Sequence, residues 1–264
     1  MDTPNTTKVG QLEKKTQNRI VSLFCDRLGY DYLGNWEDRD DNSNIEEGYL
    51  RLFLALAGHS ETLIQKAISE LKKTANHSQM SLYDLNKETY SLLRYGIKVR
   101  EELGENYQTI WPIDWKNPEN NHFAVAEEVT IRGNRTKRPD VVLYVNGIAL
   151  GVIELKRSIV SVSEGIRQNI GNQKEEFIKT FFGTVQLVMA GNDTEGLVYG
   201  TTETTEEHYV TWKEPGLGNE SRLDRSILQL CEKKRLLEMV HDFIVFDSGR
   251  KKTARHNQYF GVKA

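Results

Sequence analysis

Apolar side chains follow a helical period in the first hundred residues and form nearly continuous apolar runs after that. Residues 11–28 place apolar positions three and four apart and end at Gly29, which predicts an amphipathic helix. Further helical patterns cover residues 45–57, 61–75 and 81–103. This block shows no metal-ligand or nucleophile spacing. We therefore expect a helical insertion at residues 45–105.

The second half of the chain predicts strands separated by helices. Strands are expected at residues 123–131, 141–145, 148–155, 184–190, 197–202 and 208–212, and helices at 163–182 and 223–240. The two strands at 141–145 and 148–155 are apolar at nearly every position, which is typical of a sheet covered on both faces. The sequence therefore predicts an α/β fold with a mixed central sheet flanked by helices.

Those two apolar strands form a predicted hairpin around Asn146-Gly147 and carry three charged residues at its open end. Asp140 begins the first strand, and Glu154 and Lys156 close the second on one face. A plain two-residue turn would place Asp140 and Glu154 on opposite faces. We therefore expect a bulge or a three-residue connection, for instance Val145–Gly147, which would set Asp140 opposite Val152 and beside Glu154.

Two carboxylates and an ammonium group at a buried strand end are costly to desolvate unless a partner such as a hydrated metal ion compensates them. Asp140 and Glu154, with the Leu155 carbonyl, are candidate Mg²⁺ ligands, and Lys156 is a candidate stabiliser of phosphate charge. This set predicts metal-dependent phosphodiester cleavage. The alternative is a chance pattern, because these residue types are common.

Composition narrows the classes of function. The net charge of -3 restricts any nucleic-acid contact to local clusters. One cluster precedes Asp140 and is a candidate DNA-binding loop, formed by Arg132, Arg135, Lys137 and Arg138. A second is interpreted as a solvated loop, formed by Arg250, Lys251, Lys252 and Arg255.

Several other classes are excluded by missing patterns. The six histidines show no zinc spacing, and no Gly-rich loop ends in Gly-Lys-Ser/Thr. No apolar run is long enough for a membrane span, and the two distant cysteines suit reduced thiols. We expect a cytoplasmic protein with no membrane partner.

The string Pro139-Asp140 followed by Glu154-Leu155-Lys156 resembles the PD-(D/E)xK nuclease signature. The longer sequence is similar to the N-terminal nuclease domain of type I restriction enzyme R (motor/endonuclease) subunits. This resemblance implies a restriction-endonuclease-like nuclease domain at residues 1–245 and the start of a linker into a helicase-like motor at residues 246–264.

The resemblance also implies an activity and partners. These are Mg²⁺-dependent cleavage of double-stranded DNA after ATP-driven translocation, in a complex with modification and specificity subunits. ATP would serve the full-length subunit and not bind this chain. The family's Gln-x-x-x-Tyr motif adds Gln168 as a catalytic residue, whereas Asn172 stands where tyrosine would be. An acidic ligand in the first core helix stays open among Glu13, Glu46 and Glu47.

Three functions are compatible with the sequence. The first is the endonuclease domain of a type I restriction subunit. The second is a non-catalytic platform of the same fold that holds DNA or docks other subunits through the residue 132–138 cluster. The third is a stand-alone repair or defence nuclease.

Overall fold

The computed structural model describes residues 5–215, 218 and 220–264, with side chains described from Lys14 onward. Its centre is a seven-stranded sheet. In order across the sheet, the strands are β1 (Asp31–Asn35), β4 (Phe123–Glu127), β5 (Val141–Val145), β6 (Ile148–Leu155), β7 (Leu187–Asn192), β8 (Gly196–Gly200) and β9 (Val210–Thr211). Two neighbouring pairs, β1 with β4 and β6 with β7, are parallel, and the others are antiparallel. The predicted α/β fold with a mixed central sheet is confirmed.

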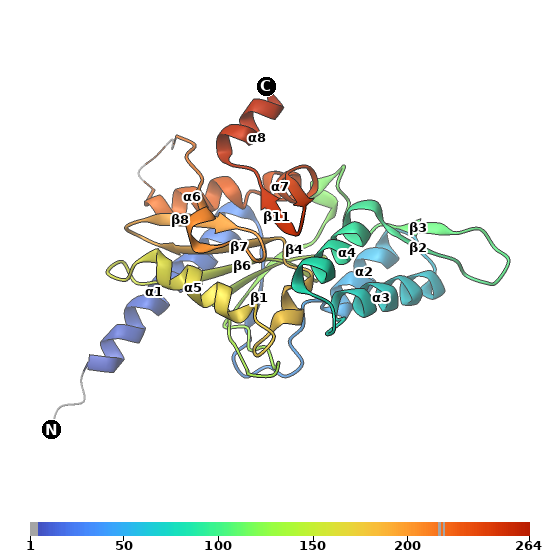
Figure 1. Ribbon diagram of the computed structural model, residues 1–264, viewed down its shortest axis with the longest axis horizontal. Coiled ribbons are helices and arrows are strands. Elements are labelled where there is room, and N and C mark those ends of the chain that lie inside the picture. Colours follow the sequence, from blue (N-terminus) through green and yellow to red (C-terminus); the bar gives the residue numbers. More distant parts are fainter. Residues whose placement is uncertain (1–4, 216–217, 219) are drawn as a thin grey trace.

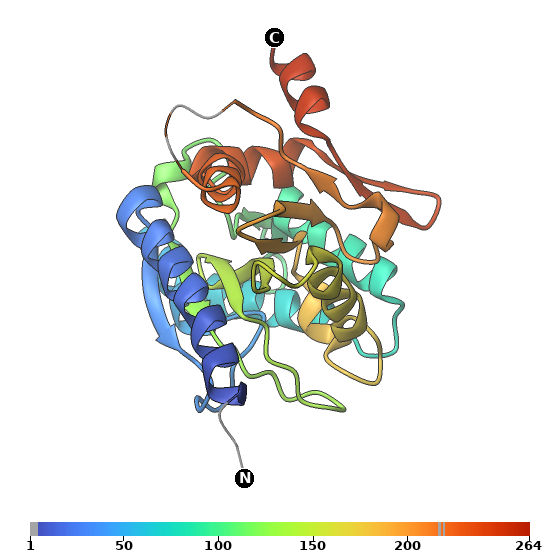
Figure 2. The ribbon, with the colours of Figure 1, turned by 90° about the vertical axis from the view of Figure 1, so that its left-hand side faces the viewer.

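Helices cover both faces of this sheet. One face packs against α1 (Asn5–Leu28), α6 (Arg222–Leu230) and α7 (Lys233–Asp242), and the other against α5 (Val162–Asn172) and the short η2 (Lys179–Gly183). Figure 2 shows α1 and α5 on opposite sides of the sheet. Strands β5 and β6 are buried along their whole length because both of their faces are covered.

The helical block lies at one end of the sheet (Figure 1). It contains α2 (Glu47–Leu56), α3 (Glu61–Ala75) and α4 (Leu82–Tyr95), followed by the hairpin of β2 (Ile97–Val99) and β3 (Gln108–Ile110). The predicted helix at 81–103 is too long, because Gly96 adopts a φ of 78° and ends α4. The buried Asn86 amide donates to the carbonyls of Phe182, Gly183 and Val185, which ties α4 to η2.

Other predicted helices are shorter than expected. The segment 163–182 divides into α5 and η2, and the segment 223–240 divides into α6 and α7. The second division occurs at Glu232, whose carboxylate accepts from the backbone N–H groups of Lys234 and Arg235 and so begins α7. None of the described helices is long and apolar enough to cross a membrane.

Several elements were not predicted as such. They are β1, the hairpin of β10 (Ile244–Asp247) and β11 (Arg250–Thr253), the helix α8 (His256–Lys263), and the short η1 (Pro118–Asn120) and η3 (Glu206–His208). The second basic cluster is therefore not a solvated loop. Lys251 on β11 is 7% exposed, and its ammonium lies 3.3 Å from the Val185 carbonyl oxygen.

The β5–β6 hairpin closes through a two-residue turn, so the predicted three-residue connection is wrong. Val145 pairs with Ile148, and Asn146 and Gly147 both adopt positive φ, at 50° and 78°. The buried Asn146 side chain accepts from the His122 N–H and donates to the Pro112 carbonyl. A Cβ on Gly147 would lie 2.5 Å from the Glu46 carbonyl oxygen, so this position requires glycine.

A bulge in β6 shifts the strand pairing so that Asp140 and Glu154 lie on the same face of the sheet. The pairing shifts between Tyr144 opposite Ala149 and Leu143 opposite Gly151, which leaves Leu150 as an extra residue. Beyond the bulge Val141 pairs with Ile153, so Asp140 and Glu154 follow as the next opposed pair on one face. The expected bulge is confirmed, but Asp140 lies opposite Glu154 and not opposite Val152.

Candidate active site

Helix α5 covers the ends of β6 and β7 and brings Gln168 over the hairpin. Ser161 caps the helix, and its side chain accepts from the Ser163 N–H. Gly165 allows a close approach, since a Cβ there would lie 3.1 Å from the Ala190 Cβ and 3.5 Å from the Glu154 Cβ. Gln168 consequently reaches the charged residues at the end of β6.

The Gln168 amide bridges two of the predicted site residues. Its Nε2 donates to Glu154 Oε2 at 2.6 Å, and its Oε1 accepts from the Lys156 ammonium at 2.8 Å. The predicted position of Gln168 within reach of the cluster is confirmed, while its role in cleavage stays a prediction. Because Lys156 can only donate, it also fixes which end of the amide faces Glu154.

Asp140 is held against the same strand end. Its Oδ2 accepts from the Leu155 backbone N–H at 2.7 Å, and its own carbonyl accepts from the Glu128 N–H at 2.9 Å. Gln17 of α1 also donates to that carbonyl, at 3.4 Å. The structure therefore brings Asp140, Glu154 and Lys156 together, with the Leu155 backbone between the last two.

The electrostatics of Glu154 are unusual for a residue in a sheet. Its side chain is 0% exposed. Burial raises the pKa of the Glu154 carboxyl well above its usual range, and the neighbouring Asp140 carboxylate adds to the rise, while Lys156 opposes it. Two anionic carboxylates here repel each other in a dry environment, and a cation between them would relieve that cost.

The donors fit a hard divalent cation. Carboxylate oxygens, from Asp140 and Glu154, and a backbone carbonyl oxygen, from Leu155, are ligand types that Mg²⁺ accepts. The described residues hold no group of three or more His, Cys, Asp or Glu side chains able to bind a metal. Mg²⁺ commonly keeps several waters and needs only one or two protein carboxylates, so the pair is sufficient.

Asn172 is a site residue that the sequence interpretation set aside. It is 1% exposed, and its Nδ2 lies 3.4 Å from Glu154 Oε1. Together with Gln168 it gives each oxygen of the Glu154 carboxylate an amide neighbour. The signal that could have found it is the four-residue spacing, which places positions 168 and 172 on the same helix face.

Two of the acidic candidates for a further ligand lie elsewhere. The Glu46 N–H donates to the Gly147 carbonyl at the turn end of the hairpin, and its carboxylate accepts from Arg39. The Glu47 carboxylate accepts from Lys72 and Arg51. The third candidate, Glu13, lies outside the residues whose side chains are described.

The predicted DNA-binding loop precedes Asp140 and is partly neutralised. Arg132 pairs with Asp40 at 2.5 Å, and Arg138 pairs with Glu128 at 2.8 Å and also with Glu37. The cations of Lys137 and Arg135 lie 4.0 Å and 5.9 Å from the Phe177 ring centroid. Contact of this loop with DNA stays a prediction.

Known proteins with similar sequences support the resemblance to type I restriction enzymes. A protein of Methanocaldococcus jannaschii named for the type I restriction enzyme MjaVIIIP is 28% identical over 252 residues, covering 90% of this chain and 24% of the relative. The type I restriction enzyme HindI endonuclease subunit of Haemophilus influenzae is 25% identical over 221 residues, covering 76% of this chain and 21% of the relative. The chain thus spans less than two thirds of either relative.

A family model described as the type I restriction enzyme R protein N terminus matches residues 10–207. That range includes the whole candidate site, from Asp140 to Asn172, and six of the seven strands of the central sheet; β9 lies outside it. The chain therefore belongs to the family of type I restriction enzyme R proteins and corresponds to their N-terminal part.

Proposed function

We propose that this chain is a Mg²⁺-dependent endonuclease domain that cleaves double-stranded DNA. The observation that carries the proposal is the arrangement of Asp140, Glu154, Lys156 and Gln168 on one face of a buried hairpin end, linked by hydrogen bonds of 2.6 and 2.8 Å through Gln168. The relatives are named as restriction endonuclease subunits, which supports the same reaction class.

Each residue has a distinct role in this proposal. Asp140, Glu154 and the Leu155 carbonyl would hold Mg²⁺. Bound there, the ion would act as a Lewis acid and lower the pKa of a water molecule that it binds. The Lys156 ammonium donates to a phosphate oxygen and stabilises the charge that develops during cleavage. Gln168 keeps Lys156 and Glu154 in their relative orientation, so the groups are aligned before DNA arrives.

The family supplies the wider context of the proposal. In the full-length subunit, an ATP-driven motor would translocate DNA before cleavage, within a complex that contains modification and specificity subunits. The basic loop at residues 132–138 would contact the DNA backbone beside the site. The nuclease domain would end at residue 245, and residues 246–264 would lead toward the motor.

A second candidate is a non-catalytic DNA-holding or subunit-docking platform. The observation that favours it is the small number of ligands: among the described residues two carboxylates meet at the site, and burial raises the pKa of the Glu154 carboxyl. If the site binds metal weakly, the fold would stay intact and phosphodiester cleavage would be slow.

Titration of the chain with Mn²⁺, followed by calorimetry, separates the two candidates. The nuclease proposal predicts one site that is lost in Asp140→Asn and in Glu154→Gln, and retained in the control Asp247→Asn, which removes an exposed carboxylate on β10. Equal Mn²⁺ binding by all four proteins would contradict the proposal, and no binding by the wild type would favour the platform.

A further inference from the structure

A second hollow lies away from the candidate active site, between the helical block and α7. Its volume is about 890 Å³, and residues from α2, α4, α7 and the segment 111–118 line it. Ile113 and Leu237, both buried, contribute its apolar part. The hollow shares no residue with the Asp140, Glu154, Lys156 and Gln168 cluster.

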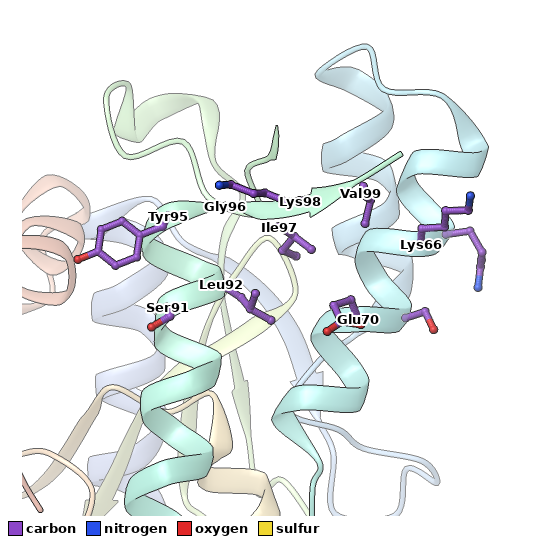
Figure 3. A pocket seen from close by; sticks show the side chains of 11 residues that line it. Lys66, Glu70, Ser91, Leu92, Tyr95, Gly96, Ile97, Lys98 and Val99 are labelled. Carbon is purple, nitrogen blue, oxygen red and sulfur yellow. The ribbon is translucent and has the colours of Figure 1, made fainter. Parts of the chain in front are cut away.

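Aromatic rings form much of its lining. Trp111 is 45% exposed and Tyr95 is 61% exposed. Figure 3 shows a neighbouring pocket between α3 and α4, which Tyr95 also lines; the Tyr95 ring extends from the end of α4, away from Lys66 and Glu70 on α3. Trp115 is fixed by a hydrogen bond from its Nε1 to the Leu93 carbonyl at 3.0 Å. The hollow therefore offers flat apolar surfaces, of which the Trp115 ring is held in place before any ligand binds.

Three cations and three carboxylates line the hollow, and each carboxylate has a partner within the protein. Asp114 accepts from the N–H groups of Lys116 and Asn117, Glu238 accepts from Tyr259 and Lys263, and Asp242 lies 2.7 Å from His241. Arg94, Lys116 and Lys234 also line the hollow, and in the described part of the chain no ion pair engages them. The Arg94 guanidinium lies 5.4 Å from the Tyr95 ring centroid.

We propose that this hollow binds an unpaired nucleobase together with its attached phosphate. A base would stack on exposed tryptophan or tyrosine faces, and the three cations that are in no ion pair among the described residues would contact the phosphate. A volume of about 890 Å³ suits a ligand of this size. The same chemistry is present in a free nucleotide and in a single DNA strand, and the experiment below distinguishes these sources.

Tryptophan fluorescence reports on the hollow directly. Trp111 and Trp115 line it, whereas Trp36 and Trp212 are buried elsewhere. The chain would be titrated with dAMP and, separately, with a short unpaired oligonucleotide, and labelled oligonucleotide anisotropy would supply a second measurement. The variants are Trp111→Leu and Arg94→Gln, and the control is Tyr107→Leu, an exposed aromatic residue outside the hollow.

We expect saturable quenching that weakens on the order of tenfold in both variants and stays unchanged in the control. Quenching by dAMP and the oligonucleotide alike identifies a nucleotide site, and quenching by the oligonucleotide alone identifies a DNA strand as the source. Absence of quenching at millimolar dAMP and oligonucleotide would overturn the proposal. Binding that neither variant weakens would also overturn it. Because Mn²⁺ binding at Asp140 and Glu154 is measured separately, failure here leaves the proposed nuclease untouched.

Discussion

The two ends of the β5–β6 hairpin are both buried and both polar, yet they are built differently. At the turn end, the Asn146 side chain receives and donates hydrogen bonds of 2.8 and 3.0 Å that satisfy the surrounding backbone. At the open end, burial raises the pKa of Glu154, and the neighbouring Asp140 carboxylate raises it further. A satisfied buried network stabilises a fold, whereas a crowded carboxylate pair costs stability unless a cation joins it.

The open end should control cleavage and leave the fold intact. Asp140→Ala, Glu154→Ala and Lys156→Ala should each reduce DNA cleavage by the assembled enzyme at least about a hundredfold to a thousandfold, because each removes a group that the proposed mechanism assigns to the metal or the phosphate. ATP hydrolysis by the same assembly should be unchanged. A variant with wild-type cleavage would remove that residue from the site.

Gln168→Leu should have a smaller effect on the same reaction. The amide contacts Lys156 and Glu154 and orients them, so its loss should lower cleavage or metal affinity by roughly 10- to 100-fold. Arg167→Leu is the matched control, because Arg167 on the same helix is exposed and pairs with Glu206. Equal rates in the two variants would show that the bridge is dispensable.

The turn end should show the opposite behaviour. Asn146→Gly keeps the positive φ but leaves the His122 N–H and the Pro112 carbonyl without their side-chain partner. We expect the free energy of unfolding to fall by about 1–3 kcal/mol, measured by urea denaturation, with Mn²⁺ affinity unchanged. Loss of metal affinity with normal stability would reverse the assignment of the two ends.

The open end of the hairpin should also make the stability of the protein depend on pH. This is the smallest of the expected effects. The raised pKa of Glu154 means that the folded state binds its proton more tightly than the unfolded state. Protonation of Glu154 therefore makes its full contribution to the free energy of unfolding below the ordinary glutamate pKa of about 4.3. This contribution is lost as pH rises through the pKa of Glu154 in the folded state. Without metal, the wild-type Tm should fall relative to Glu154→Gln as pH increases above about 4.3, and added Mg²⁺ should reduce the difference. Parallel Tm curves would contradict the shift.

Much of the fold could be predicted because the apolar periodicity is strong where elements are long. The helix expected at 61–75 matches α3, and β5 matches its expected range. Elements that form because of packing against neighbouring segments could not be predicted from the local sequence pattern. Strand β1 is short and partly exposed, and β11 contains three basic residues that resemble a solvated loop, although Lys251 is buried by packing against Val185 and Gln186.

The charged residues that the structure brings together could be predicted from the sequence, but their geometry only in part. A shared face for Asp140 and Glu154 required an odd register, which predicted a bulge or a three-residue connection. The position of that bulge could not be read, because Leu150 and Gly151 lie in an apolar run where neither face is marked by polar residues. Asn172 was set aside because it differs from the tyrosine of the resembled motif, and its contact with Glu154 depends on the close packing of α5.

The most direct test is the anomalous scattering of crystals soaked in Mn²⁺, with Ca²⁺ as the cleavage-inert comparison. We predict one Mn²⁺ peak between the carboxylates of Asp140 and Glu154, within ligand distance of both, with Lys156 still bridged to Glu154 through Gln168. A saturated crystal with no peak between these carboxylates, or with Mn²⁺ bound only elsewhere, would contradict the shared-metal site and the nuclease mechanism built on it.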